Sequence, residues 1–543
     1  MVFARRSTTL LAAIIASCAM VLSLTACTSD NKTVVDGQTT VTSNSAGGVA
    51  VFTPSDGITL NQQTPLNKWA KLVHDLTKAL VDAGFKKGDI DHTTSDSLDK
   101  QSRAIQDFVV DHLSNNTTDD SGIAIAPDNM TLLVAPVVEA DASTRQYGDY
   151  VSQNLSTNDA TDEGATSDGE SSEDDSSKDD SSNTESDSTA SDEQAQAVDR
   201  LVSSLKLAKE SGMHVVLLGN SIEGYKPDAF VKFSDAQTIG KLQAEKMVSK
   251  LKLDKASKDN PKYIEVLLPY TAVDEKGNAN DSTFAQEAFR GIWQVLGSYY
   301  QKGVVESPSG TLDGKSTEND WQAVAYDAAK EGSTAKVLDK RLAKTDGQST
   351  LTRIDGIITM NDYIASEVVK ELDDLGYTGS AADINPQITI SGIVGNITGK
   401  KDLSRDAVPD PIKSPENDNA NDSSSSDDDA DEDTSASDKD RDSQWPLVTG
   451  YGAYVSNIPS IVNGKQWMTG MEDRQTIATD IAQACAKLNK DEALNSMPSI
   501  RNSEVGGVKK IPTISEPLLA VSASNLKSAL IDPGYISLAD AGL

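Results

Sequence analysis

The chain has 543 residues and a formal net charge of −34. At roughly 100–200 residues per domain, this length allows two to four domains. So acidic a chain is poorly suited to nucleic acid, because phosphate binding requires clustered lysine and arginine. Outside the N-terminus no apolar run approaches the roughly 20 residues of a membrane span, which excludes a polytopic membrane protein.

The N-terminus has the pattern of a secretory signal followed by a lipid-attachment site. Arg5 and Arg6 precede an almost wholly apolar run over residues 10–24, and the sequence Leu-Thr-Ala-Cys ends at Cys27. The basic start, the short apolar core and the small residues after it predict a signal peptide over residues 1–26. The ending resembles a bacterial lipobox, which implies cleavage before Cys27, acyl chains on that residue and anchoring at the extracytoplasmic face of the bacterial cell membrane. The alternative is an ordinary secretory signal with a chance cysteine.

The cysteines and histidines predict no disulfide, no metal site and no cofactor. Once Cys18 leaves with the signal and Cys27 is lipidated, Cys485 has no partner for an intramolecular disulfide. None of the four histidines lies at a metal-binding spacing from another ligand type, so we expect no zinc site. Residues 27–46 are rich in Thr, Ser, Asn and Asp after the cysteine, which favours a flexible tether.

Helical and strand patterns alternate along the rest of the chain. In the first helical segment, Leu66, Trp69, Val73, Leu76 and Leu80 recur at helical spacing. Strands that alternate with helices of this kind predict βαβ units and parallel sheets, and two series of such units predict two lobes. The expected strands are 48–53, 132–138, 214–219, 263–268, 304–306, 357–360 and 388–392, and the expected helices are 65–81, 98–113, 195–211, 284–300 and 362–375, with a further helix from Trp321.

Two acidic tracts interrupt this pattern. Residues 151–193 hold 14 Asp or Glu and one Lys, and residues 416–442 hold 12 Asp or Glu with one Lys and one Arg. Tracts with so few apolar residues cannot bury enough surface to become ordered, so we predict disordered insertions over 151–193 and 404–444. Each tract follows the carboxyl end of an expected strand, the edge where open α/β sheets bind ligands, so we expect both near the mouth of a site. The first interpretation of the two acidic tracts is that they are solvated, disordered segments without a specific partner. The alternative is that they bind divalent cations loosely or contact the cell wall.

Short motifs in a fixed order carry a resemblance to a known family. Lys68-Trp69 opens the first helix where that family has Arg-Trp, and Met360-Asn361-Asp362 ends a strand where it has Asn-Asp or Tyr-Asp. The other matching stretches are Phe233-Ser234-Asp235 with Leu242-Gln243-Ala244, Asn457-Ile458-Pro459-Ser460-Ile461 with Gly464-Lys465-Gln466, and the tail from Ile511-Pro512-Thr513 to Ile531-Asp532-Pro533-Gly534-Tyr535. On these motifs the chain resembles the periplasmic sugar-binding proteins of ABC transporters, which have the type I solute-binding fold, and in particular their xylose-binding and multiple-sugar-binding branch.

The resemblance covers about residues 47–543 apart from the tracts, and it implies an α/β architecture. The implied fold has two Rossmann-like lobes with parallel sheets, joined by three hinge crossovers near Asp235, Glu472 and Pro512. A ligand would bind between the lobes and favour their closed form, which a transporter permease would sense. The implied lobes are an N-terminal one over 47–234 and 473–512 and a C-terminal one over 235–472 and 513–543.

The site implied by the resemblance combines planar polar side chains, which bond sugar hydroxyls, with an aromatic face for the ring. Lys68 could donate to hydroxyls, Trp321 falls where the family stacks an aromatic ring, and Asn361 could both donate and accept. The residues expected to bind ligand are Lys68, Trp69, Asn220, Asp235, Asp281, Trp321, Asn361, Asp362 and Glu472. Two other interpretations stay open: the two tryptophans could belong to the core, and Asn361-Asp362 could cap the following helix.

Four of the family's site positions have changed in this chain. Where the family has an Asp-Arg pair, this chain has Asn220-Ser221, and where the family has two asparagines, it has Thr283-Phe284. Where the family has Gln-Asp, this chain has Ile393-Val394, and where the family has a lysine, it has Glu472. Because charge is lost and apolar side chains are added, a larger glycan, a less hydroxylated molecule or no ligand at all are alternatives to a simple sugar.

No motif supports an enzymatic function. The run from Gly219 to Gly224 follows a strand but is not Gly-x-Ser-x-Gly, and no histidine follows Ser221, which excludes the hydrolase order of Ser, acid and His. There is no P-loop and no Gly-x-Gly-x-x-Gly after the first strand. We therefore expect a lipid-anchored receptor that delivers a sugar or related small molecule to an ABC transporter permease. The alternative is a degenerate solute-binding fold that acts as a cell-surface sensor or interaction protein without transport.

Overall fold

The computed structural model describes residues 32–35, 38–41, 46–56, 65–115, 125–138, 145–156, 185–273, 280–343, 351–381 and 444–543. The chain separates into two compact units, Met1–Ser45 and Ala46–Leu543. In the first unit, β1 (Lys32–Val35) and β2 (Gln38–Val41) pair antiparallel, so strands occupy part of the expected tether. The predicted signal peptide and Cys27 lie outside the described residues.

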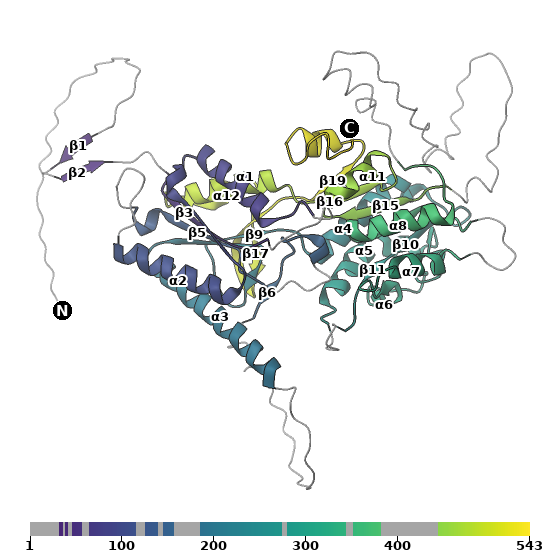
Figure 1. Ribbon diagram of the computed structural model, residues 1–543, viewed down its shortest axis with the longest axis horizontal. Coiled ribbons are helices and arrows are strands. Elements are labelled where there is room, and N and C mark those ends of the chain that lie inside the picture. Colours follow the sequence, from purple (N-terminus) through teal and green to yellow (C-terminus); the bar gives the residue numbers. More distant parts are fainter. Residues whose placement is uncertain are drawn as a thin grey trace, which may run out of the picture. The chain divides into compact units, whose positions relative to one another are not determined.

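The described part of the second unit contains two large sheets, and the larger one forms the first lobe. Its seven strands lie in the order β17-β18-β9-β7-β5-β3-β4. Figure 1 labels β17, β9, β5 and β3 in this lobe. Neighbouring strands pair in parallel except β17 and β18, which pair antiparallel. The strands are β3 (Gly48–Pro54), β4 (Ile90–Ser95), β5 (Met130–Val134), β7 (His214–Leu218), β9 (Ala229–Lys232), β17 (Ile500–Val505) and β18 (Val508–Ser515), and the helices are α1 (Trp69–Asp82), α2 (Leu98–Asn115), α3 (Glu185–Glu210) and α12 (Arg474–Leu488).

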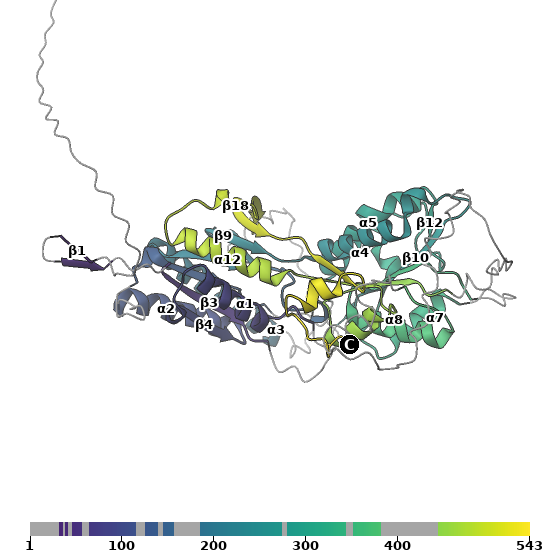
Figure 2. The same ribbon diagram turned by 90° about the horizontal axis from the view of Figure 1, so that it is seen from above.

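Helices cover both faces of this first sheet. Val49 and Val51 of β3 pack with the apolar faces of α1 and α12, which lie beside each other (Figure 2). Ala50 and Phe52 pack on the opposite face with α2 and α3. Because successive strand residues point to opposite faces, a strand buried on both sides is largely apolar, as residues 49–52 of β3 are.

The second lobe is built on a six-stranded sheet in the order β12-β10-β14-β15-β16-β19. All neighbours pair in parallel except β16 and β19. The expected α/β fold with two largely parallel sheets is therefore confirmed. The elements are β10 (Lys262–Val266), β12 (Val305–Glu306), β14 (Gly356–Ile358), β15 (Leu447–Tyr451), β16 (Met468–Met471), β19 (Leu519–Ser522), α4 (Ala236–Leu251), α5 (Thr283–Gln301), α6 (Trp321–Val324), α7 (Ser333–Arg341), α8 (Asp362–Leu375) and α11 (Ile458–Val462), with the short pair β11 (Leu268–Pro269) and β13 (Ala325–Tyr326).

The chain passes between the two sheets three times. The first passage, through Ser234, joins β9 to α4, and the second, through Glu472, joins β16 to α12. The third joins β18 to β19 and begins only after Ser515. Pro512, where the third crossover was expected, lies inside β18 opposite Asn502, so this boundary falls later than predicted.

The elements differ from the sequence expectations in several places, and the strands β9 and β15 to β19 and the helix α12 were not among the expected elements. The edge strand β4 was not predicted, because most of its residues are exposed and polar. The predicted acidic insertion over 151–193 is too long at both ends, since Val151 is buried and α3 begins at Glu185. The helix expected from Trp321 is only α6, a single turn. The strand expected at 388–392, Ile393-Val394 and the second acidic tract apart from Gln444 lie outside the described residues.

Candidate functional site

The carboxyl-terminal edges of the two sheets meet through their loops. The segment before α1 contacts the end of β15, where Leu66 N donates to Gly452 O at 2.9 Å and Asn67 Nδ2 donates to the Tyr451 hydroxyl at 3.2 Å. The Tyr451 hydroxyl also hydrogen-bonds Ser234 Oγ in the first passage. Ligands of open α/β sheets bind at this edge, so the junction between the lobes is the candidate site.

Asn361 and Asp362 begin α8 at this junction. Asn361 is the N-cap, and its side chain accepts from Ile364 N at 2.9 Å. Asp362 is fully buried and accepts from Gln466 Nε2 at 2.7 Å and Thr469 Oγ1 at 2.8 Å. Burial raises the pKa of Asp362 to about 6, although these hydrogen bonds oppose the rise. The capping interpretation thus applies to Asn361, and Asp362 holds its own lobe together.

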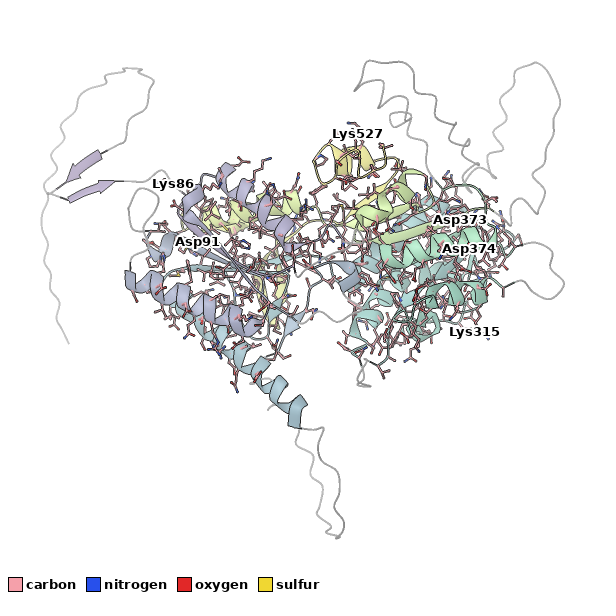
Figure 3. All side chains as sticks on the ribbon, viewed as in Figure 1. Lys86, Asp91, Lys315, Asp373, Asp374 and Lys527 are labelled. Carbon is pink, nitrogen blue, oxygen red and sulfur yellow. The ribbon has the colours of Figure 1, made fainter. Side chains whose placement is uncertain are left out.

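The aspartates of α8 lie at its two ends. Asp362 is buried at the first turn, whereas Asp373 and Asp374 lie near the last turn (Figure 3). Asp373 pairs with Lys465 at 2.8 Å. An α-helix rises about 1.5 Å per residue, so these exposed charges are roughly 16 Å along the axis from the junction and do not belong to the site.

Glu472 and Asp235 belong to the passages between the lobes. Glu472 is buried and accepts from Ser234 N, and burial raises its pKa to about 7. Asp235 caps α4 by accepting from Thr238 N at 2.7 Å, and it pairs with Lys232 at 2.9 Å. Burial would raise the pKa of Asp235, but the hydrogen bonds from Thr238 and Lys232 outweigh it and lower that pKa. Both carboxylates therefore organise the hinge region.

Trp321 and Asp281 make their contacts within the second lobe. Trp321 is almost buried and packs edge-on against Tyr270, with ring centroids 5.1 Å apart. Asp281 is exposed and accepts from the backbone N–H of Thr283 at 2.9 Å, just before α5. The core interpretation therefore accounts for Trp321, and Asp281 stabilises a helix start.

Lys68, Trp69 and Asn220 are brought together on the first lobe. Lys68 Nζ pairs with Asp149 Oδ1 at 2.8 Å. Trp69 is buried and packs against Tyr150, with ring centroids 5.1 Å apart, so it belongs to the core as its helical spacing allowed. Asn220 follows β7 and accepts from Gln153 N at 2.9 Å while donating to a carbonyl after β5. All three contact the same stretch of chain.

That stretch, residues 145–156, was missed as part of the site. Gln146 Oε1 accepts from Asn361 Nδ2 at 3.0 Å, and the Gln146 carbonyl accepts from the Tyr454 hydroxyl at 2.7 Å. Tyr147 is buried against Phe284 of α5, with ring centroids 4.7 Å apart. The available signal was two tyrosines on either side of a glycine immediately before the acidic tract, an unusual composition for a solvated insertion.

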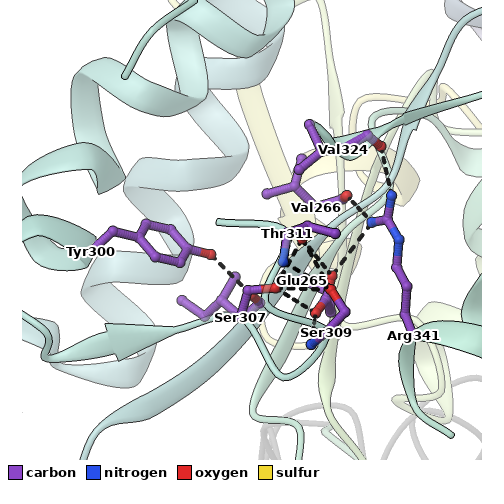
Figure 4. Close-up of polar contacts among 9 residues, drawn as sticks. Glu265, Val266, Tyr300, Ser307, Ser309, Thr311, Val324 and Arg341 are labelled. Atoms are coloured by element: carbon purple, nitrogen blue, oxygen red, sulfur yellow. Dashed lines mark hydrogen bonds and ion pairs between the residues drawn. The ribbon is translucent and has the colours of Figure 1, made fainter. Parts of the chain in front are cut away.

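A second buried polar cluster lies in the second lobe, around Glu265 of β10 (Figure 4). Glu265 Oε1 accepts from Ser307 Oγ at 2.6 Å and Ser309 N at 2.8 Å, and its other oxygen pairs with Arg341 at 3.4 Å. Arg341 also donates to the carbonyl of Val324 at 2.9 Å, and burial lowers the pKa of its guanidinium. The cluster ties β10, the loop after β12 and α7 together, and its charges are already neutralised.

The described part of the chain has neither a cluster of metal ligands nor a membrane-spanning helix. There, no group of three or more His, Cys, Asp or Glu side chains is arranged to hold a metal ion. None of the helices described is both long and apolar enough to cross a membrane. A surface groove on α1 is lined by Val73, His74, Thr77 and Val81 together with His92 of β4, and it lies on elements other than the junction loops.

Comparisons with known proteins found no matching family model and no matching curated protein. Among solved structures, an ABC transporter solute-binding protein from Clostridium phytofermentans with bound β-D-glucose is similar, with 17% identity and a TM-score of 0.44 over 91% of this chain and 99% of that one. A carbohydrate transporter solute-binding protein from Chloroflexus aurantiacus in complex with D-glucose has 18% identity and a TM-score of 0.42, over 92% and 98% of the two chains. A periplasmic ribose ABC transporter protein from Conexibacter woesei has 12% identity and a TM-score of 0.41, over 90% and 96%. These proteins are of the kind that the sequence motifs resemble.

Proposed function

We propose that this protein is a lipid-anchored extracellular solute-binding protein that captures a sugar or a related small molecule between its lobes and delivers it to an ABC transporter permease. The observation that carries the proposal is the meeting of two parallel sheets at their carboxyl edges, with three passages between them. That arrangement supplies a binding edge from each lobe and a hinge about which the lobes can move. The lipobox ending at Cys27 supports the anchor.

The side chains at the junction suit a neutral ligand that carries several hydroxyl groups. Asn361 contributes an amide, Lys68 an ammonium group, and Phe284 an aromatic ring. Amide and ammonium groups bond hydroxyls, while aromatic faces cover the apolar side of a sugar ring. The first compounds to test are D-glucose, D-allose and myo-inositol, which are named as ligands in similar solved structures.

Calorimetric titration of the full chain with these three compounds tests the proposal. A ligand at 1,000 times its dissociation constant stabilises a protein by about 4 kcal/mol, so thermal unfolding provides a second readout. Asn361→Ser keeps a good helix cap but loses the amide donor, so we expect weaker binding with little change in the unfolding midpoint. The control is Asn463→Ser at an exposed position on the second lobe, which should leave affinity unchanged. Absence of binding by all three compounds would contradict the proposal for this ligand class.

A second candidate function is a cell-surface sensor or interaction protein that has kept the fold without transport. One observation favours it: Phe284, at a position where the family has a polar side chain, packs on Tyr147 and fills the junction with the chain's own side chains. On this hypothesis, sugars fail to bind both the wild-type chain and a Tyr147→Ala variant. Binding by the variant would favour the receptor instead.

A further inference from the structure

Residues 146–155, called the strap below, run along the first lobe and reach into the second. The later half is fixed to the first lobe, where β6 (Asn154–Leu155) pairs in parallel with β8 (Ser221–Ile222). Ser152 N donates to Ser234 O at 3.2 Å, and Asp149 N donates to Asn67 O at 2.9 Å. This half of the strap is therefore attached by backbone hydrogen bonds.

The earlier half of the strap inserts its side chains between the lobes. Gln146 bridges to Asn361 and Tyr454 through two hydrogen bonds. Tyr147 is 1% exposed and belongs to the apolar core of the second lobe, where its ring contacts those of Phe284 and Tyr451. The strap thus carries an amide and an aromatic ring from the first lobe into the second.

The strap contacts the residues from which the sequence predicts a ligand site. Of the nine predicted binding residues, four touch it through hydrogen bonds, an ion pair or ring contacts. Lys68 contacts Asp149 of the strap, and Trp69 contacts Asp149 and Tyr150. Asn220 contacts Gln153, and Asn361 contacts Gln146. Phe284 contacts the strap as well, at a fifth position of the family's site.

We infer that the strap is a built-in occupant of the site, and that a ligand entering between the lobes must displace Gln146 and Tyr147. The inference rests on the proposed function and specifies how that site is regulated. The strap occupies partners that a sugar would use for its hydroxyl groups and its ring face: its amide hydrogen-bonds Asn361, its carboxylate pairs with Lys68, and its aromatic ring packs against Phe284. A ligand whose hydroxyl groups satisfied Asn361 and whose ring packed against Phe284 would take the places of Gln146 and Tyr147, while Asp149 stays with the fixed half of the strap.

Two features make the inserted half of the strap displaceable, and a third makes its seated conformation sensitive to substitution. The Tyr147 hydroxyl is buried near Asn361 but has no hydrogen-bond partner of good geometry, so it loses little when it leaves. Gln146 is only partly buried. Gly148 has φ +96°, and a Cβ there would lie 2.7 Å from Cβ of Asn67, so only glycine allows the strap to turn at this point.

Occupation by the strap has a quantitative consequence for affinity. The apparent dissociation constant equals the intrinsic one divided by the fraction of molecules in which the site is open. If the strap is seated in about nine molecules of ten, its removal strengthens binding about tenfold. Removal of a core element would not strengthen binding, so the sign of the change separates a strap from a part of the core.

The test combines hydrogen–deuterium exchange and calorimetry on the full chain, with D-glucose as the first probe and D-allose and myo-inositol after it. The variants are Tyr147→Ala, which removes the inserted ring, and Gly148→Ala, which disfavours the turn. The control is Gly224→Ala, which has φ +70° but no atom within 4 Å of the added Cβ. We expect the peptide covering 146–155 to exchange faster in both variants and, in the wild type, on addition of sugar, with sugar affinity about tenfold higher in the variants.

Each outcome separates the strap from the proposed function. Equal affinity in wild type and variants, with no faster exchange at 146–155 on addition of sugar, overturns the strap and leaves the receptor standing. Exchange that also rises in β5 and β15 of both variants shows that residues 146–155 are an integral part of the core, which overturns the strap whether or not sugar binds. Faster exchange confined to 146–155 with no binding of any of the three compounds supports a detachable strap and contradicts the sugar receptor.

Discussion

The buried carboxylate of Glu472 accepts a hydrogen bond from the backbone N–H of Ser234, and it thereby ties the second passage between the lobes to the first. Ser234 in turn hydrogen-bonds the Tyr451 hydroxyl at the end of β15. A charged group at this place loses its hydration when the chain folds, so its ionisation opposes folding. The hinge region therefore contains a group whose protonation affects stability near neutral pH.

The first prediction concerns this pH dependence and the variant Glu472→Gln. Because the pKa of Glu472 is raised to about 7 in the folded chain, the folded state holds a proton between about pH 4.5 and 7 that the unfolded state has released. Stability from this group therefore rises as pH falls through that window. A shift from 4.5 to about 7 corresponds to on the order of 3 kcal/mol. Glutamine keeps the acceptor for Ser234 N without the charge, so the variant should be more stable than wild type at pH 8.

Chemical denaturation at pH 8, 7, 6 and 5 measures this effect. Asp362 and Asp149 also have pKa values raised to about 6. The stability of both the wild type and the variant should therefore continue to rise as the pH falls below 6. The difference between variant and wild type should be largest at pH 8 and vanish near pH 5. Glu245→Gln, on the exposed face of α4, is the control and should match the wild type throughout. Parallel profiles for Glu472→Gln and wild type would show that Glu472 is not the titrating group.

The second prediction concerns the ion pair between Lys68 and Asp149. Burial raises the pKa of Asp149 to about 6, and the ammonium group of Lys68 limits the rise. Lys68→Met leaves a buried carboxylate unpaired, so we expect a loss of about 1–3 kcal/mol at pH 7.5. A carboxyl group whose pKa is raised in the folded state adds stability as the pH falls, and the pKa of Asp149 is raised further in the variant. The loss in free energy of unfolding should therefore become smaller towards pH 5.

Urea denaturation of Lys68→Met at pH 7.5 and pH 5 measures both the loss and its pH dependence. The matched control is Lys100→Met, which removes an exposed lysine that pairs with Asp96 at 2.7 Å with 66% of its side chain accessible. Exposed ion pairs contribute at most about 1 kcal/mol, so this control should change little. Equal losses in the two variants would mean that Asp149 is solvated and that the strap is not held by Lys68.

The sequence predicted those structural features that neighbouring residues determine, and it missed those that depend on contacts between distant residues. The helix α8 was predicted with its observed bounds, because Asn361 caps its start and Gly376, with φ +93°, ends it. Trp69 lies in a helical stripe, and a stripe by itself does not distinguish a core position from a binding position. The position of the strap depends on partners such as Asn361, more than 200 residues away in the chain. No local pattern encodes that contact, so the filled junction could not be predicted.

The third prediction concerns the close packing of α4 and α5 in the second lobe. A Cβ at Gly240 would lie 2.2 Å from the carbonyl oxygen of Ala288, and one at Gly291 would lie 2.0 Å from that of Gln237. Alanine is favoured over glycine in a helix by about 1 kcal/mol, so intrinsic propensity alone predicts that Gly240→Ala stabilises. Backbone carbonyls cannot turn away as side chains do, so the two helices must separate, and overpacking of this kind costs about 1–3 kcal/mol.

We therefore expect Gly240→Ala to lower the free energy of unfolding despite its better helix propensity, and urea denaturation measures the sign directly. Lys246→Ala on the exposed face of α4 tests propensity without any steric contact and should be nearly neutral. Since the helix pair covers the same lobe as Asn361, the variant should unfold that lobe more easily while the strands β3 and β5 of the first lobe keep their hydrogen-exchange protection. A stabilised Gly240→Ala would mean that α4 and α5 lie farther apart than their glycines indicate.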